Sequence, residues 1–119
     1  MLIKMLKSKL HRARVTDARL HYTGSIAVDS QLMEAVGLMP YESVLLASIT
    51  NGARLETYVV PADAGSGDVV VLGAAAQLIK KGDIIIIFSF AFCSPEEAKQ
   101  FKPRVVALDE NNKIVRRIS

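Results

Sequence analysis

The sequence is poor in the residues that build disulfide frameworks and metal sites. Its single cysteine, Cys93, excludes an internal disulfide and fits a reducing compartment. Only His11 and His21 accompany it, and their spacing matches no common ligand motif, so we expect no bound metal. Because the segment before Cys93 is almost wholly apolar, we interpret this cysteine as structural.

Long hydrophobic runs are also missing. The longest apolar run, residues 84–88, is strand-sized and far short of the roughly 18 residues of a membrane span. Residues 1–14 lack the apolar stretch and cleavage site of a secretory signal. We expect a soluble, cytoplasmic protein without membrane contact. A chain of 119 residues is one domain, small enough to favour oligomerisation.

Positive charge is concentrated at the start of the chain, although the net charge is only +3. No acidic residue precedes Asp17. Three interpretations stay open: a nucleic-acid surface, a mitochondrial targeting helix, or a solvated face that lends a lysine or two to an anionic pocket. No aromatic stacking pattern lies nearby, which disfavours nucleic acid. The cations are Lys4, Lys7, Lys9, Arg12 and Arg14.

Short strands separated by turns are the dominant pattern. Asn51-Gly52 predicts a hairpin with a type I′ turn, because both residues tolerate positive φ. Pro61 and the glycine-rich stretch after it are expected to end that hairpin. The β-branched run at 84–88 is typical of a strand buried on both faces. The predicted strands are residues 43–49, 54–60, 69–72, 84–88, 104–108 and 113–117, the last two forming a second hairpin.

Helices are few and brief. The predicted ones are residues 31–36, with Asp29 or Ser30 as cap and Gly37 as stop, residues 74–80, and a turn begun by Ser94-Pro95-Glu96-Glu97. Many short strands with a few short helices predict a mainly β, barrel-like single domain over residues 1–119. Composition and periodicity give no activity.

Four segments carry more specific information. They are Lys9-Leu10-His11-Arg12 with Leu20-His21-Tyr22-Thr23-Gly24-Ser25, Thr50-Asn51-Gly52-Ala53-Arg54-Leu55-Glu56-Thr57-Tyr58, Gly73-Ala74-Ala75-Ala76, and Gly82-Asp83-Ile84-Ile85-Ile86-Ile87. In this order and spacing, over residues 1–115, the chain resembles the bacterial aspartate 1-decarboxylase family, whose members are pyruvoyl-dependent.

The resemblance implies a double-ψ β-barrel, assembled as a homotetramer with active sites between neighbouring subunits. It implies a lyase that converts L-aspartate to β-alanine and carbon dioxide for pantothenate and coenzyme A synthesis. The precursor would cleave itself between Gly24 and Ser25 into residues 1–24 and 25–119. The implied cofactor is a covalent pyruvoyl group derived from Ser25, with neither metal nor pyridoxal phosphate, and no nucleic acid or membrane as partner. The need for a maturation factor stays open.

The resemblance also implies the residue roles. The pyruvoyl group from Ser25 would form a Schiff base with the substrate amine and act as an electron sink. Thr57 would bind the oxyanion of self-cleavage and later the substrate, and Tyr58 would return a proton to the α-carbon. Gly24 suits the cleavage site because glycine allows conformations that a side chain forbids. The implied substrate-binding residues are Lys9, Arg54, Thr57, Gly73, Ala74 and Ala75, with His11 and Tyr22 in support.

Two positions depart from the family pattern. Relatives commonly have Asn where this chain has Leu72, and often Trp where it has Ala47. The first change removes an amide near the cleavage site, so we expect slower processing. The second is expected to enlarge the pocket. Two alternatives remain: the same chemistry on another acidic amino acid, such as glutamate or cysteine sulfinate, and a non-enzymatic basic β-barrel that binds nucleic acid.

Overall fold

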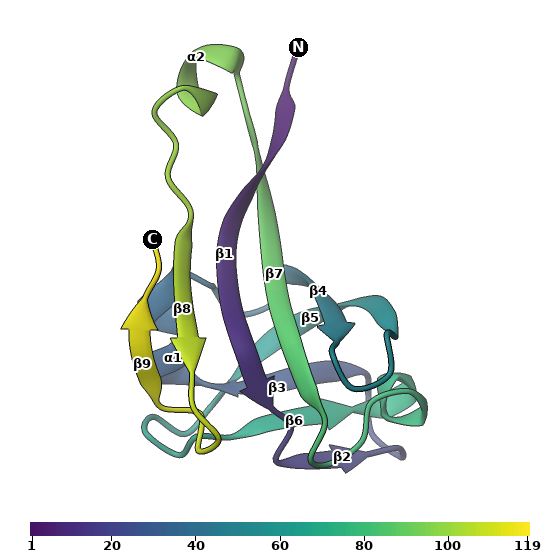
Figure 1. Ribbon diagram of the computed structural model, residues 1–119. Helices are drawn as coiled ribbons and strands as arrows, with labels where there is room; N and C mark the ends of the chain where they lie inside the picture. Colours follow the sequence, from purple (N-terminus) through teal and green to yellow (C-terminus); the bar gives the residue numbers. More distant parts are fainter.

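A computed structural model describes all residues, 1–119, and is mainly β (Figure 1). The strands are β1 (Ile3–Arg14), β2 (Asp17–Arg19), β3 (Ser25–Asp29), β4 (Ser43–Ser48), β5 (Arg54–Ala62), β6 (Val69–Leu72), β7 (Ile84–Cys93), β8 (Arg104–Leu108) and β9 (Ile114–Arg117). The helices are α1 (Ser30–Val36), α2 (Pro95–Ala98) and the 3₁₀ helix η1 (Gly73–Gln77).

The strands follow one another in the order β2-β6-β3-β5-β4-β7-β1-β8-β9. Three neighbouring pairs are parallel: β1 with β8, β2 with β6, and β3 with β5. The other pairs are antiparallel. The mainly β, barrel-like fold is thereby confirmed, while the double-ψ topology stays a prediction.

Strands β1 and β7 form a long ribbon that projects from the rest of the molecule, with α2 and the N-terminus at its tip (Figure 1). The ribbon stretches the molecule to 43 Å, against 28 and 25 Å in the other directions. Because residues 3–14 form a strand, the interpretation of the basic N-terminal stretch as a targeting helix is wrong.

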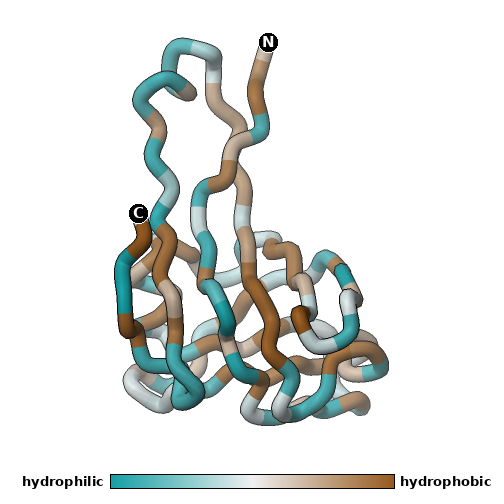
Figure 2. Tube along the Cα trace, in the orientation of Figure 1, coloured by the Kyte–Doolittle hydropathy of each residue, from teal (hydrophilic) through white to brown (hydrophobic).

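Strand β7 contributes Ile85 and Ile87 to the core, and the lower part of its trace is strongly hydrophobic (Figure 2). Ile85, Ile87 and Ser89 are buried, whereas the residues between them are partly exposed. The prediction that this strand is buried on both faces is therefore wrong; it alternates, as expected for one face on the core. The largest fully buried side chains elsewhere are Leu10, Ile26, Leu46, Ile79, Val15, Val28, Val36, Val44, Val59 and Val69.

The hairpin of β4 and β5 is confirmed, but its turn is not type I′. Gly52 has a φ of 77°, and Asn51 does not have positive φ. Instead, the Gly52 N–H donates to the Ser48 carbonyl, and the Asn51 side chain accepts from the Ala53 N–H. Strand β5 also runs through Pro61, which was expected to end it, because that stretch pairs with β3.

The helix signals are confirmed where they are local. Asp29 caps α1 by accepting from the Gln31 N–H, and Gly37 ends it with a φ of 73°. Ser94 and Glu97 form a capping box at α2. The helix predicted at residues 74–80 is the shorter η1, and the hairpin of β8 and β9 is confirmed. No helix has the length and apolar character needed to cross a membrane.

Candidate functional site

Gly24 immediately precedes β3, between two neighbouring strands. On one side, Ser25 of β3 lies opposite Leu72 of β6 in an antiparallel pair. Continuing that register by one residue sets Gly24 opposite Gly73. The predicted cleavage site therefore lies where β6 gives way to η1.

On its other side β3 runs parallel to β5, with Ile26 opposite Val59. Continuing this register back by two residues sets Gly24 beside Thr57. The two motifs that sequence analysis placed together in one site, at 24–25 and 57–58, are thus neighbours in the sheet.

The backbones of Gly24 and Gly73 touch directly, and we call this the glycine contact. Gly73 has a φ of 82°, and a Cβ added to it would lie 2.6 Å from the Gly24 Cα and 2.9 Å from the Gly24 nitrogen. The same Cβ would lie 2.9 Å from the Tyr22 carbonyl oxygen. All three are backbone atoms, so no side chain can swing away to make room. Only glycine fits at position 73.

Gly24 itself is under no such constraint. Its φ lies outside the left-handed region, and an added Cβ would meet only the Leu72 carbonyl oxygen, at 3.9 Å. The expectation that Gly24 needs a conformation forbidden to other residues is therefore wrong. The steric demand falls on Gly73, the residue packed against it.

A cavity of about 310 Å³ opens beside Gly24. The expected residues Thr57, Ala74 and Ala75 line it, and Ser25, only 5% exposed, lies next to it in the chain. Sequence analysis missed Glu56 as a lining residue, although it stands inside the recognised motif. The remaining lining residues are Leu55, Leu72 and Leu78, which make the wall largely apolar.

The two expected cations do not line this cavity. Lys9 of β1 lies opposite Phe88 of β7, with its ammonium group 5.3 Å from the ring centre. Phe88 lies opposite Leu45 of β4, which lies opposite Glu56. Lys9 is therefore three strand spacings, about 14 Å along the sheet, from Glu56. Arg54 is exposed at the start of β5.

Tyr58 also stands apart from the cavity. Successive residues of a strand point to opposite faces, so its side chain points away from that of Thr57. Its ring lies 6.2 Å from that of Tyr41, and it is 38% exposed. The register that sets Gly24 beside Thr57 sets Ser25 beside Tyr58. Within one protomer the structure therefore brings together Gly24, Ser25, Thr57, Tyr58 and residues 73–75, although Tyr58 does not line the cavity, and it leaves Lys9 and Arg54 outside.

The supporting residues are placed as follows. Burial, helped by the charges of Lys9, Arg12 and Arg116, lowers the pKa of His11, so its imidazole is neutral at pH 7. Its Nδ1 is buried without a hydrogen-bond partner. Tyr22 is exposed, and it reaches the site through its carbonyl oxygen rather than its ring.

The two positions expected to depart from the family pattern, Leu72 and Ala47, lie in different places. Leu72 lines the cavity and lies directly opposite Ser25. Ala47 is buried in β4, opposite Arg54. The first therefore lies at the predicted cleavage site itself, and the second lies beside one of the expected substrate cations in the strand pair.

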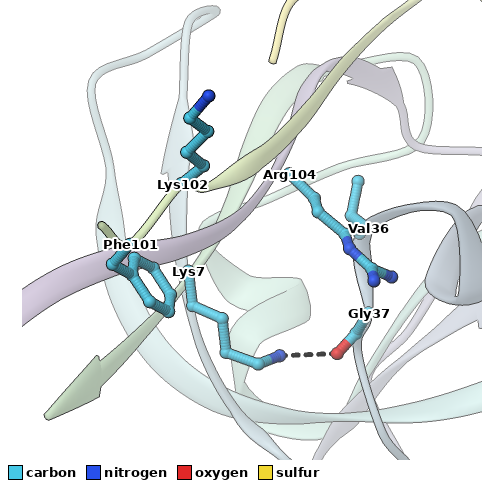
Figure 3. Close-up of a pocket in the computed structure, with 6 residues that line it drawn as sticks. All are labelled: Lys7, Val36, Gly37, Phe101, Lys102 and Arg104. Atoms are coloured by element: carbon cyan, nitrogen blue, oxygen red, sulfur yellow. Dashed lines mark hydrogen bonds between the residues drawn. The ribbon is translucent and has the colours of Figure 1, made fainter. Parts of the chain in front are cut away.

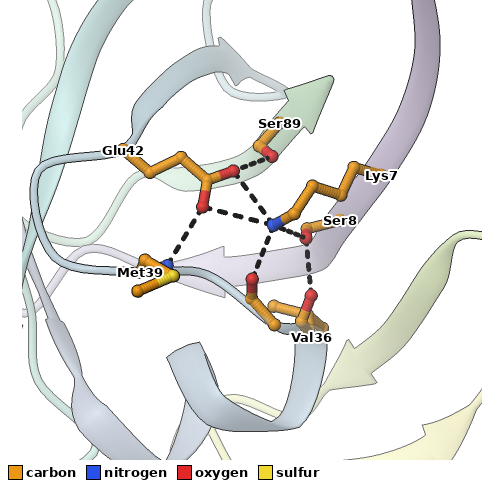
Figure 4. Close-up of polar contacts among 7 residues, drawn as sticks. Lys7, Ser8, Val36, Met39, Glu42 and Ser89 are labelled. Carbon is orange, nitrogen blue, oxygen red and sulfur yellow. Dashed lines mark hydrogen bonds and ion pairs between the residues drawn. The ribbon is translucent and has the colours of Figure 1, made fainter. Parts of the chain in front are cut away.

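A second polar group, the Lys7 cluster, shares no residue with the lining of that cavity (Figure 4). The Lys7 ammonium group lies 3.0 Å from a Glu42 carboxylate oxygen and also donates to the Gly37 carbonyl. Ser89 donates its hydroxyl to the same carboxylate, and Ser8 donates to the Val36 carbonyl. Lys7 also borders a cavity of about 430 Å³ that contains no expected site residue (Figure 3).

Hydrogen bonding fixes the charge of this cluster. Burial alone would raise the pKa of Glu42, but hydrogen bonds from Ser89, the Met39 N–H and Lys7 outweigh it, and the pKa lies below its usual value. Glu42 is therefore an anion throughout the neutral range. The cluster ties the segment after α1 to β1 and β7.

The fold and the site define a class: a small, mainly β domain with a buried serine at a backbone contact, beside a cavity lined by small and apolar residues. Residues 1–115 match the family model described as aspartate decarboxylase. The chain belongs to this family.

Proteins similar to this chain bear the family's name. The aspartate 1-decarboxylase of Thermoanaerobacter pseudethanolicus is 53% identical over 111 residues, which cover 93% of this chain and 95% of the relative. That of Bacillus licheniformis is 52% identical over 92% of this chain and 87% of its own. That of Carboxydothermus hydrogenoformans is 50% identical over 98% and 91%. Membership favours an enzyme over the nucleic-acid-binding alternative.

Proposed function

We propose that this protein decarboxylates L-aspartate to β-alanine and carbon dioxide with a pyruvoyl group that it makes from Ser25. The position of the Gly24–Ser25 bond carries the proposal: it lies beside Thr57, at the edge of a cavity lined by Ala74 and Ala75. Family membership supports the substrate. The product would serve pantothenate and coenzyme A synthesis in the cytoplasm.

Self-cleavage would begin with attack of the Ser25 hydroxyl on the Gly24 carbonyl carbon. The hydroxyl proton passes to the Ser25 nitrogen, which leaves as an amine, and an ester joins Gly24 to the Ser25 oxygen. Loss of the Ser25 α-proton breaks the Cβ–O bond and releases Gly24 as a carboxylate. Residue 25, now dehydroalanine, takes up water and loses ammonia, which leaves a pyruvoyl group at the head of residues 25–119.

Thr57 would stabilise the first of these steps. The attack places negative charge on the Gly24 carbonyl oxygen, and a fixed donor next to that oxygen lowers the barrier. The register of β3 and β5 supports this role, because it sets Thr57 beside Gly24. The hydroxyl sits on a strand, so little reorganisation is needed at the moment of attack.

The surroundings of residue 25 fit a pyruvoyl group. Ser25 is buried. The backbone of Gly73 packs directly against that of Gly24, and a side chain at position 73 would overlap it. When formed, the group supplies an electron sink for the negative charge that decarboxylation leaves on the α-carbon. Tyr58, which the strand register sets beside residue 25, would deliver the proton to that carbon from its phenol hydroxyl.

Aspartate brings two carboxylates, which Arg54 and Lys9 would bind. Neither takes part in any of the three ion pairs of the chain, so both are free for a ligand. Arg54 can hold a carboxylate by two parallel hydrogen bonds. Lys9 lies too far along the sheet to serve the cavity of its own protomer. We infer that it serves the site of a neighbouring protomer in a homotetramer.

The projecting ribbon supports association. Phe92 is 67% exposed and Leu2 65% exposed, and Phe90 lies on the same face of β7 as Phe92. Exposed apolar residues gathered at one end of a molecule, here on β7 and just before β1, commonly mark a protein–protein contact.

Intact mass of the denatured protein tests the cleavage. We expect two chains, residues 1–24 and residues 25–119 with a pyruvoyl-blocked start. A single 13.0 kDa chain that persists on prolonged warming would contradict the proposal. Turnover of L-aspartate, glutamate and cysteine sulfinate then tests the substrate, and equal rates for all three would overturn the choice of aspartate.

Complementation tests the shared site. Lys9→Met and Ser25→Ala should each be inactive as a pure protein. Co-expressed, the Lys9→Met chain supplies pyruvoyl groups and the Ser25→Ala chain supplies Lys9, so mixed tetramers should regain part of the activity. No recovery in isolated mixed tetramers would show that Lys9 serves its own protomer.

A further inference from the structure

We propose that Gly73 is the positioning residue for self-cleavage: its backbone, by direct contact with Gly24, sets where the Gly24 carbonyl lies relative to the Ser25 hydroxyl. The inference rests on the proposed cleavage between Gly24 and Ser25. It concerns a residue that sequence analysis assigned to substrate contact alone.

The contact is unusually demanding. A methyl group at Gly73 would overlap the Gly24 Cα and nitrogen and the Tyr22 carbonyl oxygen, at 2.6, 2.9 and 2.9 Å. These atoms belong to the segment that carries the scissile bond. Any side chain at position 73 must therefore push residues 22–24 away from the end of β6.

The direction of that displacement matters. Ser25 is held in the antiparallel pair with Leu72 and is buried, so it stays with β6. Gly24, one residue earlier, lies outside the paired stretch and would move. The substitution thus separates the attacked carbonyl from a fixed nucleophile, and an error of about 1 Å in such a geometry costs on the order of 100-fold in rate.

Two other glycines provide matched controls. Gly52 and Gly82 have φ values of 77° and 92°, as strained for an L-residue as the 82° of Gly73, yet an added Cβ meets nothing within 4 Å at either. Alanine at positions 52 and 82 introduces the backbone strain without the overlap. A difference between these variants and Gly73→Ala isolates the contact with Gly24.

The experiment follows self-cleavage by intact mass, from freshly purified precursor, for the wild type, Gly73→Ala, Gly52→Ala and Gly82→Ala. We expect the Gly73→Ala rate to fall by about 100-fold or more, and the two controls to stay within about threefold of the wild type. Equal rates for Gly73→Ala and the controls would overturn the inference. A wild type that never cleaves would overturn the proposed function, and this inference with it.

Loss of folding must be separated from loss of position. Melting temperatures are measured in the uncleavable Ser25→Ala background, and Val106→Ala, a core truncation in β8, serves as a destabilised comparison. A destabilised precursor cleaves in smaller amount but at the normal rate constant. A mispositioned one cleaves slowly although fully folded. A Gly73→Ala defect confined to the amount cleaved would overturn the inference.

Hydroxylamine identifies the step. It cleaves the ester that follows attack by Ser25, so it should accelerate chain cleavage in the wild type. If Gly73 positions the carbonyl for the attack, Gly73→Ala forms little ester and gains little from hydroxylamine. An ester that accumulates in this variant would place the defect after the attack and contradict the proposed role.

Discussion

Two regions of this molecule hold distant segments together by opposite means. At the glycine contact, Gly24 and Gly73 touch through bare backbone, without a side chain or a titrating group. In the Lys7 cluster, Lys7 and Glu42 join β1 to the segment after α1 through long charged side chains. The first arrangement tolerates no side chain at Gly73, and the second can adjust its geometry but depends on charge. We therefore expect the glycine contact to control the rate of self-cleavage and the Lys7 cluster to control stability.

The largest expected effect comes from removing the nucleophile beside the glycine contact. Ser25→Ala should abolish both chain cleavage and decarboxylation, because no pyruvoyl group can form. The residue is small and buried, so the fold should persist. Intact mass and an aspartate assay measure the result, and circular dichroism checks the fold. Any cleavage at position 24 in this variant would contradict the assignment of Ser25.

Thr57→Val tests the role of Thr57 in self-cleavage. Thr57 lies beside Gly24 on the β5 side, away from Gly73. Valine keeps the shape and strand propensity of threonine but cannot donate to the oxyanion. Loss of one such donor typically costs about 100- to 1000-fold in rate. The cleavage rate should fall by that order, with the melting temperature nearly unchanged. Cleavage at the wild-type rate would show that Thr57 has no part in the first step.

A smaller effect on the self-cleavage rate is expected from alanine at Gly24 than from alanine at Gly73. A methyl group at Gly24 meets only the Leu72 carbonyl oxygen at 3.9 Å, whereas one at Gly73 meets three backbone atoms below 3.0 Å. Gly24→Ala should therefore slow self-cleavage less than Gly73→Ala does, although it lies at the scissile bond. Parallel time courses by mass spectrometry decide the order. The reverse order would locate the steric demand at Gly24.

Leu72→Asn should increase the rate of self-cleavage. Leu72 lies opposite Ser25 and lines the cavity without offering a hydrogen bond. An amide that makes one additional hydrogen bond in the transition state is worth about 1 kcal/mol, or about fivefold in rate. Faster cleavage of the freshly purified precursor is the expected outcome. An unchanged or lower rate would mean that leucine at this position is not what limits processing.

Local signals in the sequence predicted local structure well. The capping pattern at Ser94 and the Asp29 cap fix short helices because the partners lie within three residues. Strand β1 escaped sequence reasoning, because it is basic and its partners, β7 and β8, lie far along the chain. The type I′ turn was wrong because Asn51 uses its side chain, rather than positive φ, to close the loop.

In the candidate site, too, some features could be predicted from the sequence and others depend on how distant strands pair. Ser25 and Thr57 could be named from the sequence, through the family resemblance. The contact between Gly24 and Gly73 could not, since it depends on the register of β3 against β6 and on a turn into η1. Nor did the sequence show that Lys9 lies several strands from the cavity, which is a property of strand order alone.

The smallest expected effect on cleavage, and the sharpest contrast, comes from Glu42→Gln in the Lys7 cluster. The pKa of Glu42 is held below its usual value of 4.5, so the ionised carboxylate contributes stability above that pH and loses it as the pH falls further. Glutamine leaves Lys7 without its counter-charge and should lower the free energy of unfolding by about 1–3 kcal/mol at pH 7.

Melting temperatures of the uncleavable Ser25→Ala protein, with and without Glu42→Gln, should differ most at pH 7 and converge as the pH falls below 4.5. The cleavage rate constant of the folded protein should stay within about twofold, because no side chain of the cluster lines the cavity beside Gly24 and its loss lowers stability without moving the Gly24 carbonyl. A large fall in that rate constant, at full folding, would show that the Lys7 cluster and the glycine contact are coupled, and that the division between stability and rate does not hold.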